Sequence, residues 1–197
     1  MSEYERYEHS GAVITLHWDE DPQDPRKWND CYAGRMLCWH DRYTLGDDQV
    51  TQDSDAIYDV LDAAGADVVL PLYLYDHSGI TMSTDTAGFS AVDREAWDWG
   101  MVGVIYSTPA TRAALGLEPD LDLDLVRTYL AGEVEEYDQY LTGQVYGYTV
   151  EKEGELLGSC WGFFGDDGLT EARLEAEYAA EAEAKATATI SFYEAAH

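Results

Sequence analysis

Two pairs of segments joined by short turns most constrain the fold of this chain. In residues 67–84, the apolar segments "DVVLPLYLYD" and "GITMST" are separated by only two residues. A parallel pair of strands needs a crossover of about a dozen residues, so these two segments must pair antiparallel. Val145–Glu151 and Leu156–Phe164 flank Glu153-Gly154 and predict a second hairpin. Both features favour a mostly antiparallel sheet.

Further segments complete an α+β fold. Strands are predicted at residues 11–19, 35–43 and 99–109. A helix is predicted in residues 50–66, with Gly65 at its C-terminal end. Residues 121–142 place apolar side chains every three or four positions, which predicts an amphipathic helix packed on the sheet. Its stripe consists of Val126, Leu130, Val134, Tyr137 and Leu141. We therefore expect a sheet of about six to eight strands with one packed amphipathic helix and smaller helices.

The C-terminal part of the chain differs in composition from the rest. Residues 169–197 are rich in Ala and Glu and have high helix propensity. Their apolar stripe is weak, because Leu169, Leu174 and Tyr178 are followed only by alanines. We expect residues 1–168 to form a single α+β domain. Residues 169–197 should form an acidic, Ala/Glu-rich C-terminal helix or tail that is solvated or docked on a partner.

The chain is extremely acidic, with 40 Asp and Glu against 11 Lys and Arg and a formal net charge of -29. Its 46% hydrophobic content still argues for a folded chain. Self-repulsion of this size weakens the compact state unless counterions screen it, and at molar salt the Debye length falls to ~3 Å. One interpretation is therefore a halophilic protein. The other is a mimic of DNA, which carries one charge per ~1.7 Å of its axis.

Acidic residues in the two predicted helices fall mostly off the apolar stripes, so we expect them to be solvated and to form an interaction surface. They are Glu133, Glu135, Glu136, Asp138, Glu171, Glu175, Glu177 and Glu181. The partner of such a surface would be a protein, such as one that normally binds nucleic acid. Direct binding to nucleic acid is disfavoured, because the chain has no run rich in Lys or Arg.

One polar turn carries three groups that can transfer protons, Asp76, His77 and Ser78. A catalytic triad is defined by spatial geometry, and neighbouring side chains in a strand–turn–strand unit diverge. We interpret Asp76, Ser78 and Gly79 as a structural turn, in which Asp76 caps backbone N–H groups and Gly79 supplies a permissive dihedral angle. The alternative is an enzyme that uses Cys160 as nucleophile with His77 and Asp76. A small apolar core thiol is the commoner role of such a cysteine.

No metal site and no cofactor are predicted. His17, Asp19 and Asp21 alternate along one strand but lack the ligand spacing of a structural zinc site. The chain has no Gly-rich phosphate-binding fingerprint. Its three cysteines show no CxxC spacing, which indicates reduced thiols in a cytoplasm. No segment approaches the ~18 apolar residues of a membrane span, and the N-terminus shows no secretory signal.

Five stretches of the chain match the motifs of one family in the same order. They are "DEDPQDPRKWND", "MLCWHDRYTLGD", "LPLYLYDHSGITMST", "EVEEYDQYLTGQVYGYTVE" and "SCWGFFG". On these motifs, residues 19–165 resemble an uncharacterised protein family of tailed double-stranded DNA viruses of bacteria and haloarchaea. The segment "FSAVDREAWDWGMVG" departs from the family pattern, since Ala91 stands where the family has a cysteine. The resemblance implies a viral accessory role and supplies no activity.

These observations predict a non-enzymatic viral accessory protein from a salt-adapted source that binds a host or viral protein. Its most concrete form is an acidic, nucleic-acid-like inhibitor of a host nucleic-acid-binding or defence factor. A Cys/His-dependent enzyme and a virion-associated structural protein are the alternatives. The expected location is the cytoplasm of the host cell or the virion.

Overall fold

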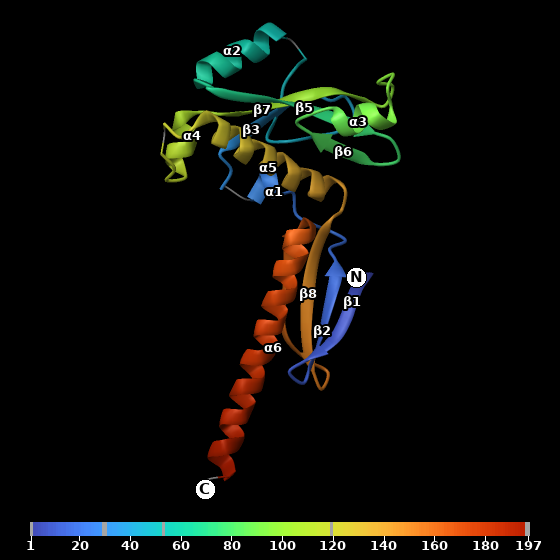
Figure 1. Ribbon diagram of the computed structural model, residues 1–197, viewed down its shortest axis with the longest axis vertical. Helices are drawn as coiled ribbons and strands as arrows, with labels where there is room; N and C mark the ends of the chain where they lie inside the picture. The colour runs from blue at the N-terminus through green and yellow to red at the C-terminus, as the bar shows by residue number, and fades with distance from the viewer. Residues whose placement is uncertain (1, 29–30, 53, 119, 196–197) are drawn as a thin grey trace. The chain divides into compact units, whose positions relative to one another are not determined.

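The computed structural model describes residues 2–28, 31–52, 54–118 and 120–195. In these residues the fold is α+β, with two sheets and six helices (Figure 1). The chain divides into two compact units. Unit 1 comprises Met1–Gln23 and Gly143–His197, and unit 2 comprises Asp24–Thr142. Unit 2 is thus inserted in the sequence between the two segments of unit 1, and the boundary expected at residue 168 lies inside a helix of unit 1.

Unit 1 is built on a four-stranded antiparallel sheet in the order β1-β2-β8-β9. The strands are β1 (Ser2–His9), β2 (Ala12–Trp18), β8 (Val145–Lys152) and β9 (Glu155–Phe164). β8 and β9 form the expected hairpin, and Glu153 (φ +54°) and Gly154 (φ +86°) make its left-handed turn. The central pair joins distant parts of the chain, since Ile14 pairs with Val150.

β1 is a strand that the sequence patterns do not predict. Its sequence, SEYERYEH, lacks the apolar run or the clean alternation of a half-buried strand. It lies at the edge of the sheet, where charged side chains discourage pairing with another chain. Tyr4 packs edge-on against Trp18 and Tyr146, with ring centroids 5.3 and 5.4 Å apart. Aromatic contacts therefore hold a strand that is otherwise polar.

α6 (Gly165–Ala195) packs along one face of this sheet (Figure 1). Its buried stripe consists of Leu169, Ala172, Ala176 and Ala180. Leu174 and Tyr178, which were expected on the stripe, are instead 61% and 75% exposed. The expectation of a solvated tail is therefore wrong for this part of the helix. Small side chains let the helix approach closely: a Cβ at Gly168 would lie only 2.7 Å from the carbonyl carbon of Phe163.

Unit 2 is built on a five-stranded mixed sheet in the order β4-β3-β7-β5-β6. The strands are β3 (Gly34–Cys38), β4 (Asp48–Gln49), β5 (Val68–Asp76), β6 (Ile80–Ser83) and β7 (Trp99–Ser107). The β3–β4 pair is parallel, and the other pairs, including the expected β5–β6 hairpin, are antiparallel. The single sheet expected from the sequence is therefore wrong, because the described residues form two sheets.

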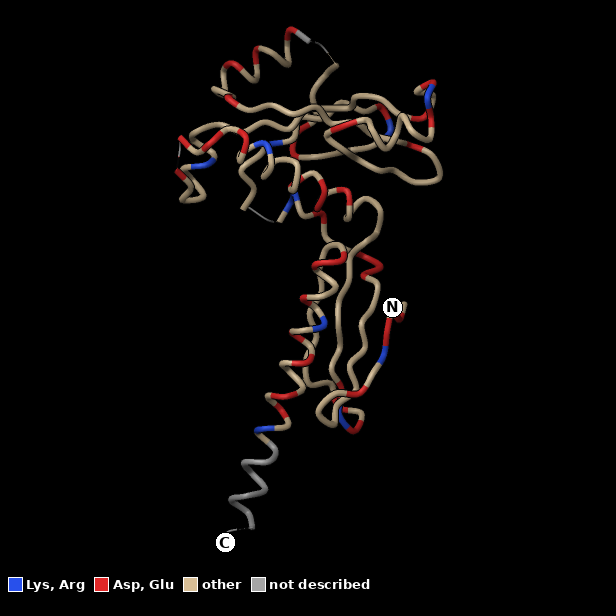
Figure 2. The backbone as a smooth tube through the Cα atoms, viewed as in Figure 1, with Lys and Arg blue, Asp and Glu red and all other residues tan. Residues whose placement is uncertain are grey.

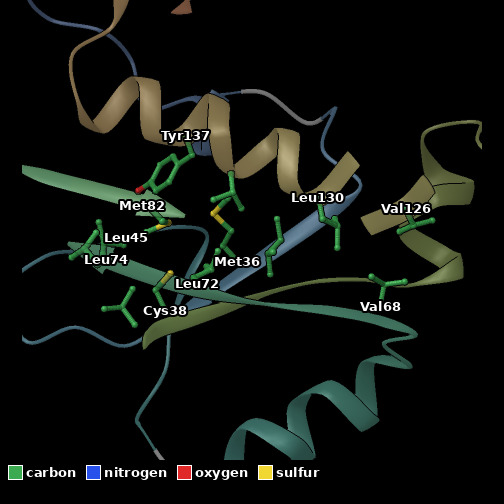
Figure 3. Close-up of a cluster of buried hydrophobic side chains, with 13 residues drawn as sticks. Met36, Cys38, Leu45, Val68, Leu72, Leu74, Met82, Val126, Leu130 and Tyr137 are labelled. Atoms are coloured by element: carbon green, nitrogen blue, oxygen red, sulfur yellow. The ribbon is translucent and has the colours of Figure 1, made fainter. Parts of the chain in front are cut away.

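Helices cover both faces of the unit 2 sheet. They are α1 (Pro25–Trp28), α2 (Ser54–Ala64), α3 (Ala87–Val92), α4 (Pro109–Ala114) and α5 (Leu123–Leu141). α5 and α2 lie on opposite faces (Figure 1). Val126, Leu130, Val134 and Tyr137 of the predicted α5 stripe are buried, and Figure 3 shows this cluster with Met36, Cys38 and Leu72 of the sheet. The amphipathic helix predicted in residues 121–142 is therefore confirmed.

Candidate functional site

The β5–β6 turn holds the residues that the sequence singled out for chemistry. Ser78 (φ +61°) and Gly79 (φ +150°) both have a positive φ, the region that favours glycine. The backbone N–H of His77 donates to the carbonyl oxygen of Gly79 at 3.1 Å. Gly79 thus has the dihedral angle that the turn needs, and Ser78 shares this conformation.

Asp76 ties the turn to another loop rather than capping it as expected. Its carboxylate accepts hydrogen bonds from Nη2 of Arg42 and from the hydroxyl of Tyr43, the latter at 3.4 Å. Strands β3 and β5 both flank β7, where Cys38 and Leu72 pair with Gly103. The carboxyl ends of β3 and β5 therefore lie at the same end of the sheet, which places the loop after β3 beside Asp76.

The acidic partner of His77 is Asp98. Nδ1 of His77 lies 3.0 Å from Oδ2 of Asp98, and both side chains are exposed. The β5–β7 pairing brings them together, since Tyr75 pairs with Trp99. Sequence reasoning missed Asp98, because only the strand register makes a residue 21 positions away a neighbour. The three adjacent residues Asp76, His77 and Ser78 thus do not form a relay: His77 turns to Asp98, and Asp76 turns to Arg42.

A cavity of about 260 Å³ lies beside this turn. Its walls include His40, Arg42, Asp76, Trp97, Asp98 and Trp99. His40 and Arg42 also line a neighbouring cavity of about 690 Å³, whose apolar wall includes Trp39, Val50 and Met101. The structure therefore places aromatic and charged side chains from three different segments of unit 2 around two neighbouring cavities.

His40 lies in the loop after β3, and its contacts define its tautomer. Nδ1 accepts hydrogen bonds from the backbone N–H groups of Arg42 and Tyr43, both at 3.2 Å. The imidazole also stacks on the ring of Tyr43, with centroids 4.9 Å apart. Because Nδ1 is an acceptor, neutral His40 carries its proton on Nε2.

Cys160 lies in unit 1, on the face of β9 that α6 covers. It pairs with Tyr148 across the hairpin and packs against the core that contains Phe163 and Ala176. Its Sγ lies 3.9 Å from the carbonyl oxygen of Trp161. His77 and Asp76 belong to unit 2, where their partners are Asp98 and Arg42. The surroundings of Cys160 are those of a core thiol, as for the more deeply buried Cys38, whose pKa is raised to about 12 by burial.

Two carboxylates that were expected on the acidic surface are instead half-buried and bonded within the fold. Glu133 accepts from the backbone N–H of Ala33 at 2.7 Å and from that of Gly34 at 3.1 Å, and Asp138 accepts from that of Met82 at 2.6 Å. Burial raises the pKa of both groups. Glu133 and Asp138 therefore satisfy backbone donors within unit 2, and the expectation that they are solvated is wrong.

The other six acidic residues divide into paired and open groups. Glu135, Glu171 and Glu175 are exposed, although Glu175 also bonds to the hydroxyl of Tyr148. The remaining three are half-buried and have partners. Glu136 accepts from the hydroxyl of Tyr32, Glu177 accepts from that of Tyr7 at 3.1 Å, and Glu181 contacts Nε2 of His9 at 3.4 Å. On α6, Tyr7 and His9 of β1 thus contact two members of the acidic row, the hydroxyl of Tyr148 bonds to Glu175, and Glu171 is open to solvent.

Three of the sequence motifs meet at Arg26, which is only 1% exposed at its side chain. Its Nε and Nη2 donate to the two carboxylate oxygens of Asp47 at 3.1 and 2.6 Å, and its Nη1 donates to Glu133 at 3.1 Å. Nη2 also donates to the carbonyl oxygen of Gly34 at 2.7 Å. Burial alone would lower the pKa of Arg26, but the bonds and charges of Asp47 and Glu133 raise it, so the guanidinium stays charged. This cluster is structural.

Acidic residues are spread over both units. Unit 1 has 17 Asp and Glu against 4 Lys and Arg, and unit 2 has 23 against 7. Figure 2 shows acidic positions in the helices and loops of both units, with basic positions scattered among them. The excess of negative charge is therefore a property of the whole chain.

Comparison with models of known protein families, with curated proteins and with solved structures finds no match. Among the residues that the structure describes, no three His, Cys, Asp or Glu side chains are grouped as ligands for a metal ion. Every helix within the same residues is too short or too polar to cross a lipid bilayer.

Proposed function

We propose that this chain is a non-enzymatic viral accessory protein that binds a basic protein surface through its acidic exterior. In its most concrete form, the partner is a host nucleic-acid-binding or defence factor, and the protein works in a salt-rich cytoplasm. The acidic face of α6 in unit 1 and the acidic loops of unit 2 would each supply a binding surface.

The observation that carries this proposal is the burial of two arginines in ion pairs. Arg26 and Arg112 are both 1% exposed at their side chains and pair with Asp47, Glu133 and Asp67 inside unit 2. These two cations and their three carboxylates sum to a formal charge of only -1, while carboxylates such as Glu135 are exposed. A net charge of -29 therefore acts mainly outward. Fields of this sign attract basic surfaces and speed their association.

The contacts of the residues proposed for catalysis fit structural roles better than turnover. Cys160 packs under α6, and the imidazole of His77 is exposed beside Asp98. A nucleophile with a base within hydrogen-bond reach is the signature of covalent catalysis. In this fold Cys160 packs against the core of unit 1, and Ser78 forms part of the β5–β6 turn.

The test is competition by DNA for whatever the protein captures. The immobilised chain is incubated at about 0.15 M salt, where the Debye length is ~8 Å, with extract from the host and then with duplex DNA. We expect the captured proteins to bind nucleic acid and to be released by DNA. A matched variant, Glu135→Gln with Glu171→Gln and Glu175→Gln, should capture less. Capture that DNA does not displace would contradict nucleic-acid mimicry, and retention of virion proteins alone would favour the structural role.

A further inference from the structure

Trp97 is the most exposed large apolar side chain in the described residues, at 82%. It lies in the loop between α3 and β7, among Asp93, Glu95 and Asp98. Tryptophan is enriched among the residues that carry most of the binding energy at protein interfaces. An exposed indole beside carboxylates is therefore a candidate anchor for a partner.

The loop is held in place before any partner arrives. The carboxylate of Asp93 accepts from the backbone N–H groups of Asp98 at 2.9 Å and Glu95 at 3.2 Å. These backbone hydrogen bonds lower the pKa of Asp93, so it stays charged. Nε1 of Trp99 donates to the carbonyl oxygen of Asp93 at 2.8 Å, and Nε1 of Trp97 donates to Glu95 at 3.3 Å. The backbone that carries the indole is thus preorganised, which lowers the entropy that binding would cost.

Trp97 and Trp99 both line the 260 Å³ cavity beside the β5–β6 turn. The charges at this cavity favour a cation. The charge of Arg42 is offset by its ion pair with Asp76. Asp98, which pairs with His77, is the second carboxylate at the cavity. Aromatic faces beside a carboxylate bind guanidinium and ammonium groups, and a guanidinium can also stack on an indole.

We propose that this cavity receives an arginine side chain from a basic segment of a partner protein, with Trp97 and Asp98 as its main contacts. The inference rests on the proposed function and names where on the acidic surface the partner is anchored. The cavity is smaller than the ~300–1,000 Å³ typical of small-molecule sites, which suits one side chain. An anionic ligand is disfavoured by Asp76, Asp98 and the charge of the whole chain.

Another cavity of unit 2 is lined by cations, and their contacts differ from those at the Trp97 cavity. Arg26, Lys27 and Arg35 line a cavity of about 380 Å³. Arg26 pairs with Asp47, Arg35 pairs with Asp48 at 2.5 Å, and Nζ of Lys27 donates to the carbonyl oxygen of Gly46 at 2.6 Å. These cations serve contacts within the fold, whereas Trp97 presents its indole outward.

The test uses a fluorescein-labelled peptide of alternating Arg and Ser, with a second peptide in which citrulline replaces each Arg. Binding is measured by fluorescence anisotropy at about 0.15 M salt. Trp97→Ala and Asp98→Asn should each weaken binding of the arginine peptide about tenfold, and Trp97→Phe should retain part of the affinity. The citrulline peptide, which lacks the charge, should bind wild type and Trp97→Ala equally weakly.

Two control variants in α2 test whether the loss of any exposed aromatic ring or carboxylate has the same effect. Tyr58→Ala removes another exposed aromatic ring, and Asp59→Asn removes another exposed carboxylate from the same unit. Both should bind the arginine peptide within about twofold of wild type. If Trp97→Ala and Asp98→Asn behave like these controls, the proposed arginine site is wrong and the broader acidic-surface proposal stands. If wild type does not bind the arginine peptide at all, both proposals fall.

Discussion

Nη1 of Arg26 lies 3.1 Å from Oε2 of Glu133, and the two side chains are 1% and 12% exposed. Removing the cation would leave Glu133 and Asp47 as buried carboxylates without their shared partner. We expect Arg26→Met to lower the free energy of unfolding by about 3–5 kcal/mol, measured by urea denaturation. The control is Arg35→Met. The ion pair of Arg35 with Asp48 is largely exposed, so its loss should lower the free energy of unfolding by about 1 kcal/mol or less. Equal losses for the two variants would contradict the structural role of Arg26.

The buried face of α6 can be tested with two opposite substitutions. Ala176 is fully buried against the sheet, so Ala176→Leu should overpack the interface and cost about 1–3 kcal/mol. Leu174 lies on the exposed face, so Leu174→Ala should change stability by about 0.5 kcal/mol or less. Urea denaturation of both variants gives the measurement. The reverse ranking would mean that the helix packs through its larger side chains.

His17 should make unit 1 sensitive to mild acid. Nε2 lies 3.0 Å from Oγ1 of Thr149, and Nδ1 is buried without a hydrogen-bond partner in the described residues. Burial lowers the pKa of His17 below its usual value. The unfolded chain therefore binds a proton more readily, and stability falls as the pH drops below ~6.5.

His17→Gln removes the titrating group, so it should lose less stability than wild type between pH ~7.5 and ~5.5. Urea midpoints at the two pH values provide the comparison, and the difference between the two proteins isolates His17 from the other titrating groups. Parallel losses in both proteins would show that His17 is not responsible.

Salt should stabilise the whole chain. Raising KCl from ~0.1 M to ~1 M shortens the Debye length from ~10 Å to ~3 Å and weakens repulsion among exposed carboxylates. We expect a higher thermal midpoint at molar KCl, with the same direction in NaCl, because screening depends on ionic strength. A midpoint that is the same at both concentrations would show that the charge does not serve salt adaptation.

Local patterns predicted the elements whose burial follows a simple period. The α5 stripe was visible because Val126, Leu130 and Val134 are large and apolar at helical spacing. The two hairpins were visible because their turns are short. The stripe of α6 was missed because alanine contributes little apolar area. In the sequence pattern, Ala172 and Ala176 therefore indicate burial less strongly than the larger Leu174, although the structure buries the two alanines and exposes Leu174. Its packing depends on close approach, which only the partner sheet reveals.

The candidate site was less predictable because tertiary pairing assembles it. Asp98 reaches His77 through the register of β7 against β5, and Arg42 reaches Asp76 from the loop after β3. Glu133 has the composition of a solvated helical residue, yet it binds Ala33 and Arg26 across unit 2. Charge in a sequence therefore identifies an acidic protein without showing which carboxylates face outward.

The insertion of Asp24–Thr142 between the two segments of unit 1 has a consequence for biosynthesis. Every strand of the inserted unit lies within one continuous stretch, so this unit can mature as soon as that stretch leaves the ribosome. β2 must wait for β8, since Val13 pairs with Glu151 across the whole insertion. The β1–β2 hairpin is therefore translated before the inserted unit but finds β8 only after it, and a premature stop before residue 145 would leave the hairpin without this neighbour.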